Sequence, residues 1–192
     1  MTLATQLLYF LTNQDTLKGF NEFAYTSDIF KKYFQKEYQN LEKTYLNNVP
    51  QKKLVRTNLD NNLFSQITDK NSKYYIPNTR PIFKGNVYIL SNYRTGSAAA
   101  MLTTLIQDNK IGTIIGTSVG NNPIGATTYT PMELPKTKSK ISIATTYIVR
   151  PNEKGRIQIP DIWTEFSIND LINGIDPYLI SIQKQMSKNA SH

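Results

Sequence analysis

Residues 87–102 read Val87-Tyr88-Ile89-Leu90, then Ser91-Asn92-Tyr93-Arg94, then Thr95-Gly96-Ser97-Ala98-Ala99-Ala100-Met101-Leu102, and this stretch decides the fold. The apolar run predicts a strand, the polar residues a tight turn, and the third part an amphipathic helix. A second apolar run, Thr113-Ile114-Ile115, follows the helix. A connection of this length through a helix requires parallel strands. We therefore predict a βαβ unit whose first strand, Val87 to Leu90, is buried with parallel neighbours, because an unbroken apolar run suits a strand covered on both faces.

Ser97 falls at the N-terminus of the predicted helix, beside the carboxyl end of the first strand. Ligands of open α/β sheets bind at that edge. The free N–H groups of the first helical turn and the helix dipole stabilise negative charge on a bound carbonyl oxygen, so Ser97 could act as a nucleophile. The alternative is that Ser97 or Thr95 only caps the helix. The stretch differs from the hydrolase motif G-x-S-x-G, because Thr95 and Ala99 stand where its outer glycines would be.

Several motifs, taken in order, resemble the core of the tail-specific (C-terminal processing) serine peptidases. They are Thr95-Gly96-Ser97-Ala98-Ala99, then Ile114-Ile115-Gly116-Thr117-Ser118-Val119-Gly120, then Pro160-Asp161. Two further stretches are similar to the branch of that family found in many Bacteroidetes-type bacteria. These are Gly120-Asn121-Asn122-Pro123 and Ile168-Asn169-Asp170-Leu171-Ile172-Asn173-Gly174-Ile175-Asp176-Pro177.

The resemblance implies an α/β chain with a ClpP/crotonase-like fold, present as the incomplete, C-terminal part of a catalytic domain. Residues 1–185 would form that part of one domain. Within it, an irregular or helical cover would span 19–84, and the core βαβ unit with its strands would span 85–166. Residues 186–192 would be a tail.

The same resemblance implies a serine peptidase site. Ser97 would be the nucleophile and the Ala98 backbone N–H one oxyanion donor, while Gly96 and Gly120 would contact the substrate. The partner would be a polypeptide substrate, and neither a cofactor nor a metal is implied. A full-length bacterial relative would be expected in the cell envelope or periplasm, and the location of this chain itself is left open.

A serine hydroxyl needs a general base to act as a nucleophile. The only histidine is His192, the final residue, and a chain terminus does not hold an imidazole in hydrogen-bond register. In the better-known branch of the resembled family the base is a lysine downstream of the serine, but the matching stretch here is Gly120-Asn121-Asn122. Tricorn-like members take a histidine from further upstream and a supporting glutamate near the equivalent of Gln158. Glu153 is nearby, but we do not assign that role to it.

The chain has 22 Lys and Arg residues against 14 Asp and Glu, a net charge of +8. The basic residues are scattered, and their densest groups are not interleaved with aromatics as in a base-stacking platform. These groups are Lys31-Lys32 with Lys36, Lys52-Lys53 with Arg56, and Lys136, Lys138 and Lys140. We read them as solvated faces and expect no nucleic-acid partner. The chain has no cysteine, which excludes disulfides and thiolate chemistry.

Residues 2–12 carry Leu3, Leu7, Leu8 and Leu11 at helical spacing and predict a core helix. No basic residue precedes this apolar stretch, so a signal peptide is not indicated, and about ten residues are too few to span a membrane. In the resembled family the corresponding helix follows a buried strand that ends in an Asn/Gly-Gly motif, which is absent here. We therefore expect an exposed apolar surface and an unpaired sheet edge through which the chain can self-associate.

Shorter patterns predict the remaining elements. One helix is expected after Ser27 or Asp28 with an apolar face reaching Tyr38, and another over Leu59 to Ile67. The tyrosines and phenylalanines between Gly19 and Pro81 either line a peptide groove or pack in the core. Strands are predicted over Ile141 to Val149 and Ile162 to Phe166, a short helix between Ser167 and Gly174, and a last helix from Asp176-Pro177.

These observations together predict a serine endopeptidase of the tail-specific type that is truncated in this chain and inactive alone. The base and the second oxyanion donor would then be supplied from outside it. The alternative is a non-catalytic peptide- or ligand-binding module, because the same fold binds ligands without hydrolysing them.

Overall fold

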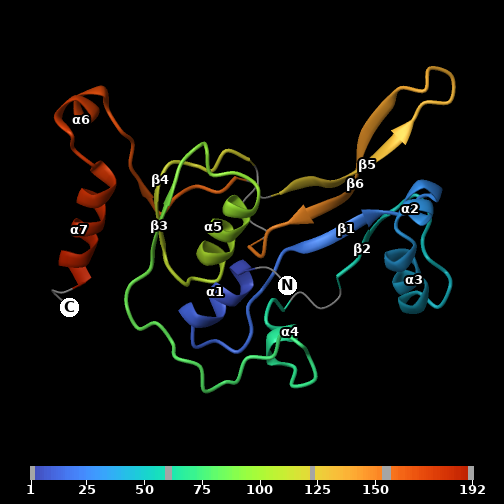
Figure 1. The fold of residues 1–192 in the computed structure, drawn as a ribbon, viewed down its shortest axis with the longest axis horizontal. Coiled ribbons are helices and arrows are strands. Elements are labelled where there is room, and N and C mark those ends of the chain that lie inside the picture. The colour runs from blue at the N-terminus through green and yellow to red at the C-terminus, as the bar shows by residue number, and fades with distance from the viewer. Residues whose placement is uncertain (1–2, 59–61, 122–123, 153–156, 190–192) are drawn as a thin grey trace. The chain divides into compact units, whose positions relative to one another are not determined.

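The structure is a computed structural model that describes residues 3–58, 62–121, 124–152 and 157–189 (Figure 1). The chain divides into two compact units, and we describe each by itself. The parallel unit comprises residues 1–19, 62–123 and 151–192, and the antiparallel unit comprises residues 20–61 and 124–150.

The parallel unit is built on a sheet of three parallel strands in the order β3, β4, β7. Their bounds are Tyr88–Ser91 for β3, Thr113–Gly116 for β4 and Ile162–Trp163 for β7. Helix α5 (Ala98–Asp108) joins β3 to β4, whose Ile114 and Ile115 are fully buried. The predicted βαβ unit with parallel strands is therefore confirmed.

Strand β3 is less buried than its apolar sequence predicts. Leu90 is 44% exposed, and β4 is the strand with which β3 pairs within the described residues. The parallel pairing predicted for residues 87–90 is confirmed by β4, but the prediction that this strand is buried is wrong. An apolar run indicates that its side chains suit burial, but it does not indicate how many strands flank the strand that carries them. The expected self-association through the free edge stays a prediction.

Helix α5 buries a face that differs from the predicted one. Leu105 and Ile106 are buried as expected, but Met101 is 36% exposed. Thr103 and Thr104 take part in the buried face instead, and their hydroxyls donate to Ala99 O and Ala100 O, both at 2.9 Å. A threonine that bonds the carbonyl one turn earlier hides its polar group, so it can occupy a buried helix position.

Helix α1 (Leu3–Leu11) confirms the predicted N-terminal helix, and Leu8 is fully buried in it. Leu3 and Leu7 are exposed, so an apolar surface lies open on this helix. The buried Arg80 closes the C-terminal end of α1 by donating Nε–H to Tyr9 O at 2.6 Å and Nη2–H to Thr12 O at 3.0 Å. Its guanidinium also lies 3.4 Å above the Tyr9 ring. The last carbonyls of a helix have no intrahelical donor and carry partial negative charge, which explains why a cation is stable there.

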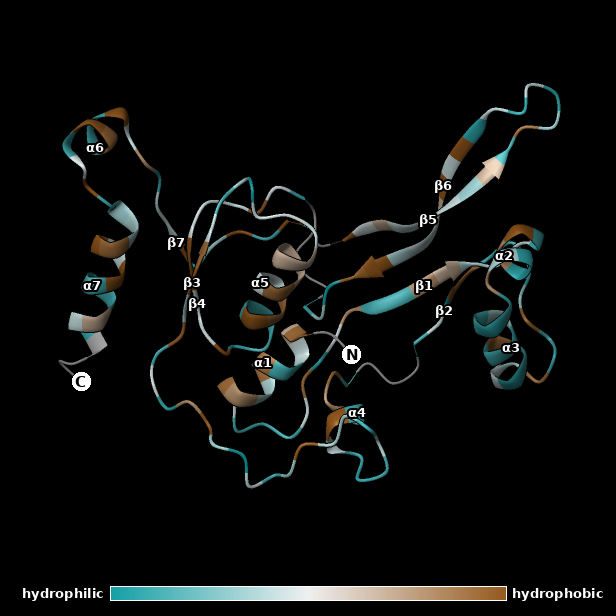
Figure 2. Cartoon of the chain, in the orientation of Figure 1, coloured by the Kyte–Doolittle hydropathy of each residue, from teal (hydrophilic) through white to brown (hydrophobic). Residues whose placement is uncertain are grey.

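The C-terminal residues form α6 (Ile168–Asn173) and α7 (Pro177–Asn189), in which hydrophobic and hydrophilic residues alternate along the helices (Figure 2). The predicted cap of α6 is confirmed as a capping box, because Asp170 N–H donates to Ser167 Oγ and Ser167 N–H donates to Asp170 Oδ2. The pKa of the Asp170 carboxyl is lowered by the hydrogen bonds that its Oδ2 accepts, first from the Ser167 hydroxyl at 2.6 Å and second from the Ser167 N–H. Helix α7 continues through residues 186–189, where the sequence predicts a tail.

The antiparallel unit holds a four-stranded sheet in the order β2, β1, β6, β5. Its strands are β1 (Asn21–Tyr25), β2 (Leu54–Arg56), β5 (Gly125–Glu133) and β6 (Lys140–Val149). Only β6 matches a predicted strand. The region 19–84, predicted as an irregular or helical cover, also contributes β1 and β2 to this sheet. Strands β1 and β2 are short and lack a clear alternation of apolar residues. Their places in the sheet are set by their partners, because β1 pairs with β6 and β2 pairs with β1.

Two predicted helices differ in extent. The helix capped by Ser27 is confirmed at its start, where Phe30 N–H donates to Ser27 Oγ at 3.2 Å, but it breaks at Phe34 into α2 (Asp28–Tyr33) and α3 (Gln35–Thr44). The helix predicted over Leu59 to Ile67 is reduced to the single turn of α4 (Ser65–Thr68), and residues 59–61 lie outside the described residues. The strand predicted over Ile162 to Phe166 is limited to the two residues of β7.

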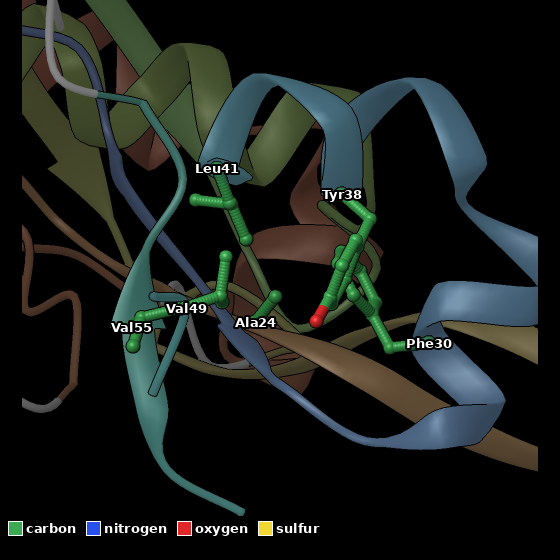
Figure 3. Close-up of a cluster of buried hydrophobic side chains, with 6 residues drawn as sticks. All are labelled: Ala24, Phe30, Tyr38, Leu41, Val49 and Val55. Carbon is green, nitrogen blue, oxygen red and sulfur yellow. The ribbon is translucent and has the colours of Figure 1, made fainter. Parts of the chain in front are cut away.

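The core of the antiparallel unit lies between its sheet and helices α2 and α3. It is a cluster of buried hydrophobic side chains from Ala24, Phe30, Tyr38, Leu41, Val49 and Val55 (Figure 3). The rings of Phe30 and Phe34 stack with centroids 5.1 Å apart. For Phe30 and Tyr38 the core interpretation is therefore confirmed over the peptide groove.

Candidate functional site

Ser97 lies immediately before α5, at the carboxyl end of β3, as predicted. Its backbone has φ 51° and ψ −126°, which non-glycine residues rarely adopt and which costs about 1–3 kcal/mol. The residue is exposed. The nucleophile of α/β-hydrolases also lies on a sharp, strained turn between a strand and a helix. The sequence lacks the G-x-S-x-G motif, but the local geometry of Ser97 is of the same kind.

The capping alternative does not describe these side chains. In the described part of the chain, Ser97 makes no side-chain hydrogen bond to the first turn of α5. The Thr95 hydroxyl is engaged within its own turn, where Oγ1 accepts Asn92 N–H at 3.1 Å. The Ser97 hydroxyl thus does not cap the N-terminus of α5, so helix capping does not explain a serine at this position.

Ala98 is the first residue of α5, so its N–H belongs to the helical turn that has no intrahelical acceptors. This is the group that the sequence predicts as an oxyanion donor, and it directly follows Ser97. A Cβ at Gly96 would lie 3.3 Å from Asn121 Oδ1, so the Asn121 side chain lies close to the Gly96 backbone. The roles of Ala98, Gly96 and Gly120 stay predictions.

Two loops meet beside Ser97. We call residues 92–97 the serine loop and residues 117–121 the Gly120 loop. Gly120 N–H donates to Thr95 O at 2.9 Å, and Ser97 N–H donates to the Asn121 side-chain oxygen at 2.7 Å. A Cβ on Gly120 would overlap the carbonyl oxygen of Tyr93, so only glycine fits this approach. The loops are therefore joined by contacts that require specific residue types.

The strands beneath these loops are locked at the same edge of the sheet. Ser91 pairs with Gly116 in the register of β3 and β4, and Thr117 N–H donates to Ser91 O at 2.9 Å. The Ser91 hydroxyl in turn donates to Thr117 O at 2.7 Å. Gly116 has φ 129°, and a Cβ there would overlap Ser91 O. This glycine allows the two strand ends to approach closely enough to hold the loops.

An open pocket of about 660 Å³ lies at the carboxyl edge of the sheet. It is lined by the last residue of β7, by residues that follow β3, β4 and β7, and by one residue of α7: Asn92, Tyr93, Thr117, Ser118, Val119, Gly120, Trp163, Glu165, Phe166 and Tyr178. Four of these are aromatic, and the rings of Phe166 and Tyr178 pack edge to face at 5.0 Å. Among the described residues of this lining, Glu165 is the one acidic residue. Such a mixture of aromatic walls and a few polar groups suits a ligand side chain.

Sequence reasoning missed Trp163 and Glu165 as site residues. The available signal was their place within the strand predicted over Ile162 to Phe166, since the carboxyl ends of parallel strands share one edge of a sheet. Gly120 was predicted as a substrate contact, and it lines this pocket.

The sequence assigns the role of base to neither His192 nor Glu153, and both residues lie outside the described part of the chain. Lys110 follows the C-terminal end of α5 and lines a second cavity, of about 430 Å³, at the amino ends of β3 and β4. A helix of this length separates its ends by about 15 Å, so Lys110 is remote from Ser97.

Gln158 is fully buried near the same remote end. Its Nε2 lies 3.4 Å from Oε1 of Gln107, which belongs to the last turn of α5. Asp161 is close by in the chain, and its two carboxylate oxygens accept Gln107 Nε2–H at 3.0 Å and Ile114 N–H at 2.7 Å. The Pro160-Asp161 motif thus holds β7 against β4, which is a structural role on the opposite edge from Ser97.

Within the described residues, no group of three or more His, Cys, Asp and Glu side chains could hold a metal ion. The helices described here also include none that is long and apolar enough to cross a membrane.

Several solved structures share this fold at low sequence identity. Mature CPAF complexed with lactacystin matches with a TM-score of 0.59 and 17% identity over 96% of this chain and 41% of that chain. A putative peptidase from Parabacteroides merdae matches with a TM-score of 0.56 and 14% identity over 95% of this chain and 46% of that chain. The chain therefore spans less than half the length of these structures, and the likeness shows the fold alone.

None of the curated proteins compared with this sequence matches it. The model of one family, Peptidase family S41, matches residues 20–164, a range that includes both loops at Ser97 and strand β4. This match extends over most of the sequence and agrees with the resemblance carried by the motifs around Ser97. The chain belongs to peptidase family S41.

Proposed function

We propose that the chain carries the nucleophile and part of the substrate site of a tail-specific serine endopeptidase. One observation carries the proposal. Ser97 is exposed on a strained turn between a parallel strand and a helix, directly before the unbonded first turn of α5. Membership of a peptidase family supports a polypeptide as the substrate.

In the proposed reaction, Ser97 Oγ attacks the carbonyl carbon of a peptide bond while a general base accepts its proton. The carbonyl oxygen becomes an oxyanion next to the Ala98 N–H, where the dipole of α5 also stabilises negative charge. Collapse expels the amine, which takes up the proton, and water then releases the acyl group from Ser97.

We further propose that the general base comes from outside residues 1–192 and that the chain alone is inactive. Support comes from the site itself, because Lys110 lies at the far end of α5 and the described residues that line the pocket include neither a histidine nor a lysine. We propose that residues 1–185 form part of a single peptidase-like domain in the longer protein. The cell envelope or the periplasm stays the expected location of a full-length relative.

A non-catalytic peptide-binding module is the second candidate function. The pocket of about 660 Å³ favours it, since such a pocket can bind a side chain without any chemistry at Ser97.

Covalent labelling separates the two candidates. Incubation with a fluorophosphonate at high concentration for hours should add one phosphonyl group to Ser97, which intact-mass measurement and peptide mapping would locate. Ser97→Ala should remove the adduct, whereas Ser139→Ala, at an exposed serine of the loop between β5 and β6, should keep it. An adduct that persists in Ser97→Ala, or no adduct in any preparation of the protein, would overturn the peptidase proposal.

Peptide binding can be followed without any chemistry. Trp163 is the only tryptophan, lines the pocket and is 58% exposed. A peptide that enters the pocket should therefore shift its emission to shorter wavelength, because the indole ring moves from water to an apolar contact. Tyr178→Ala, which removes part of the wall, should weaken the response. Unchanged emission at peptide concentrations that protect Ser97 from labelling would show that substrates bind elsewhere.

A further inference from the structure

The contact between Ser97 and Asn121 joins residues 24 positions apart in the sequence. The Ser97 N–H donates to Asn121 Oδ1 at 2.7 Å, at the short end of the range for such bonds. Asn121 is held there by its neighbour, because Gly120 N–H bonds to Thr95 O and the Gly120 backbone packs on Tyr93 O. The side chain thus approaches Ser97 from a position that the loop backbone determines.

This hydrogen bond acts on the strained residue itself. A backbone conformation with φ 51° and ψ −126° persists only where its surroundings hold it. The Ser97 N–H precedes the helix, so α5 offers it no acceptor, and the Asn121 oxygen supplies one. Asn121 therefore stabilises the conformation in which Ser97 is presented.

The orientation of the Asn121 amide follows from the same contact. Only the oxygen of a carboxamide accepts a hydrogen bond from an N–H group, so Oδ1 must face Ser97. The amide nitrogen is bonded to the same carbon as Oδ1 and lies next to it. Among the described residues Nδ2 has no acceptor, and Asn121 is exposed. The two N–H groups of Nδ2 are uncharged and are consequently available as hydrogen-bond donors beside Ser97.

We propose that Asn121 is both the positioning residue of Ser97 and, through Nδ2–H, a second oxyanion donor that acts together with the Ala98 N–H. The inference rests on the proposed serine chemistry. When Ser97 Oγ bonds to the carbonyl carbon, its proton passes to a general base, an imidazole or a primary amine. The π electron pair moves onto the carbonyl oxygen, and Asn121 and Ala98 donate hydrogen bonds to the resulting charge.

Two substitutions separate positioning from donation. Asn121→Asp keeps an oxygen that can accept the Ser97 N–H but replaces both donors with a second, negatively charged oxygen. Asn121→Ala removes the acceptor and the donors together. Asn40→Ala, at an exposed asparagine of α3, is the matched control.

Two measurements are made on residues 1–192 and each variant: hydrogen exchange of the Ser97 amide by NMR, and the relative rate of fluorophosphonate labelling at Ser97. In Asn121→Ala the amide should exchange faster, and labelling should slow by about 10²–10³-fold, the usual loss for one oxyanion donor. In Asn121→Asp the amide should stay protected while labelling slows by at least as much. The control should match the unsubstituted chain in both measurements.

The proposal is overturned if Asn121→Asp is labelled as fast as the unsubstituted chain, because the amide donors are then unused. It is also overturned if Asn121→Ala leaves the exchange of the Ser97 amide unchanged. Failure of the serine chemistry itself looks different: the unsubstituted protein would then carry no label at Ser97, and both proposals would fall together.

Discussion

Residues 1–192 should react with a fluorophosphonate at Ser97 about a hundredfold to ten-thousandfold more slowly than a longer version of the protein that brings a general base to Ser97. This is the range that general-base assistance contributes. Without a base, the Ser97 hydroxyl keeps its proton at neutral pH, and the first turn of α5 stabilises only the developing negative charge. Labelling rates followed by intact mass, with equal reagent concentrations, measure the difference.

Rapid labelling of residues 1–192 that disappears in Ser97→Ala would contradict this expectation and show that the chain contains its own base. Glu165 would then be the first side chain to replace, because it lines the pocket at the carboxyl edge of the sheet. Lys136, in the loop between β5 and β6, and Glu153 would follow. Lys110 would not, since it lies beyond the other end of α5.

Gly116→Ala should lower the free energy of unfolding by about 2–6 kcal/mol. A side chain at φ 129° costs about 1–3 kcal/mol, and the overlap of the new methyl group with Ser91 O adds about as much. Because Gly116 pairs with Ser91 and its carbonyl accepts Thr164 N–H at 2.9 Å, the methyl group would push apart the strand ends that carry both loops. Urea unfolding of the purified variant measures the loss.

Gly125→Ala is the matched control for this change. A Cβ at Gly125 meets nothing within 4 Å, so the substitution should alter stability by no more than about 1 kcal/mol. Equal urea midpoints for Gly116→Ala and Gly125→Ala would show that β3 and β4 can separate at their carboxyl ends without cost. The close approach of the two loops would then not depend on this glycine.

The sequence predicted the elements whose signals are local. The run of apolar residues before Ser91 and the helical spacing after Ser97 indicated β3 and α5, and both exist with parallel pairing to β4. Ser27 and the Ser167–Asp170 pair indicated helix starts by residue type, and their side chains make the expected cap hydrogen bonds. At both caps the deciding contacts lie within a few residues, so the pattern and the structure report the same interaction.

The sequence misjudged elements whose stability comes from distant partners. Strand β2 is three residues long and takes its place from β1, while β1 pairs with β6, far along the chain. The burial of β3 was overestimated for a related reason, because side-chain polarity does not count the strands that flank a given strand. No local periodicity carries that information.

The features of the candidate site also fall into those that local sequence determined and those that distant contacts decided. By itself, the sequence determined that a serine follows a strand and opens a helix, and its ordered motifs indicated a serine peptidase family, which the family match confirms. Only the tertiary structure decided that Asn121 meets the Ser97 N–H, that Gly120 lies on Tyr93, and that Trp163 and Glu165 line the adjacent pocket. The physical reason is that the residues of this site belong to separate segments of the chain. The pairing of β3, β4 and β7 brings these segments to the same edge of the sheet, and no local pattern in the sequence records that pairing.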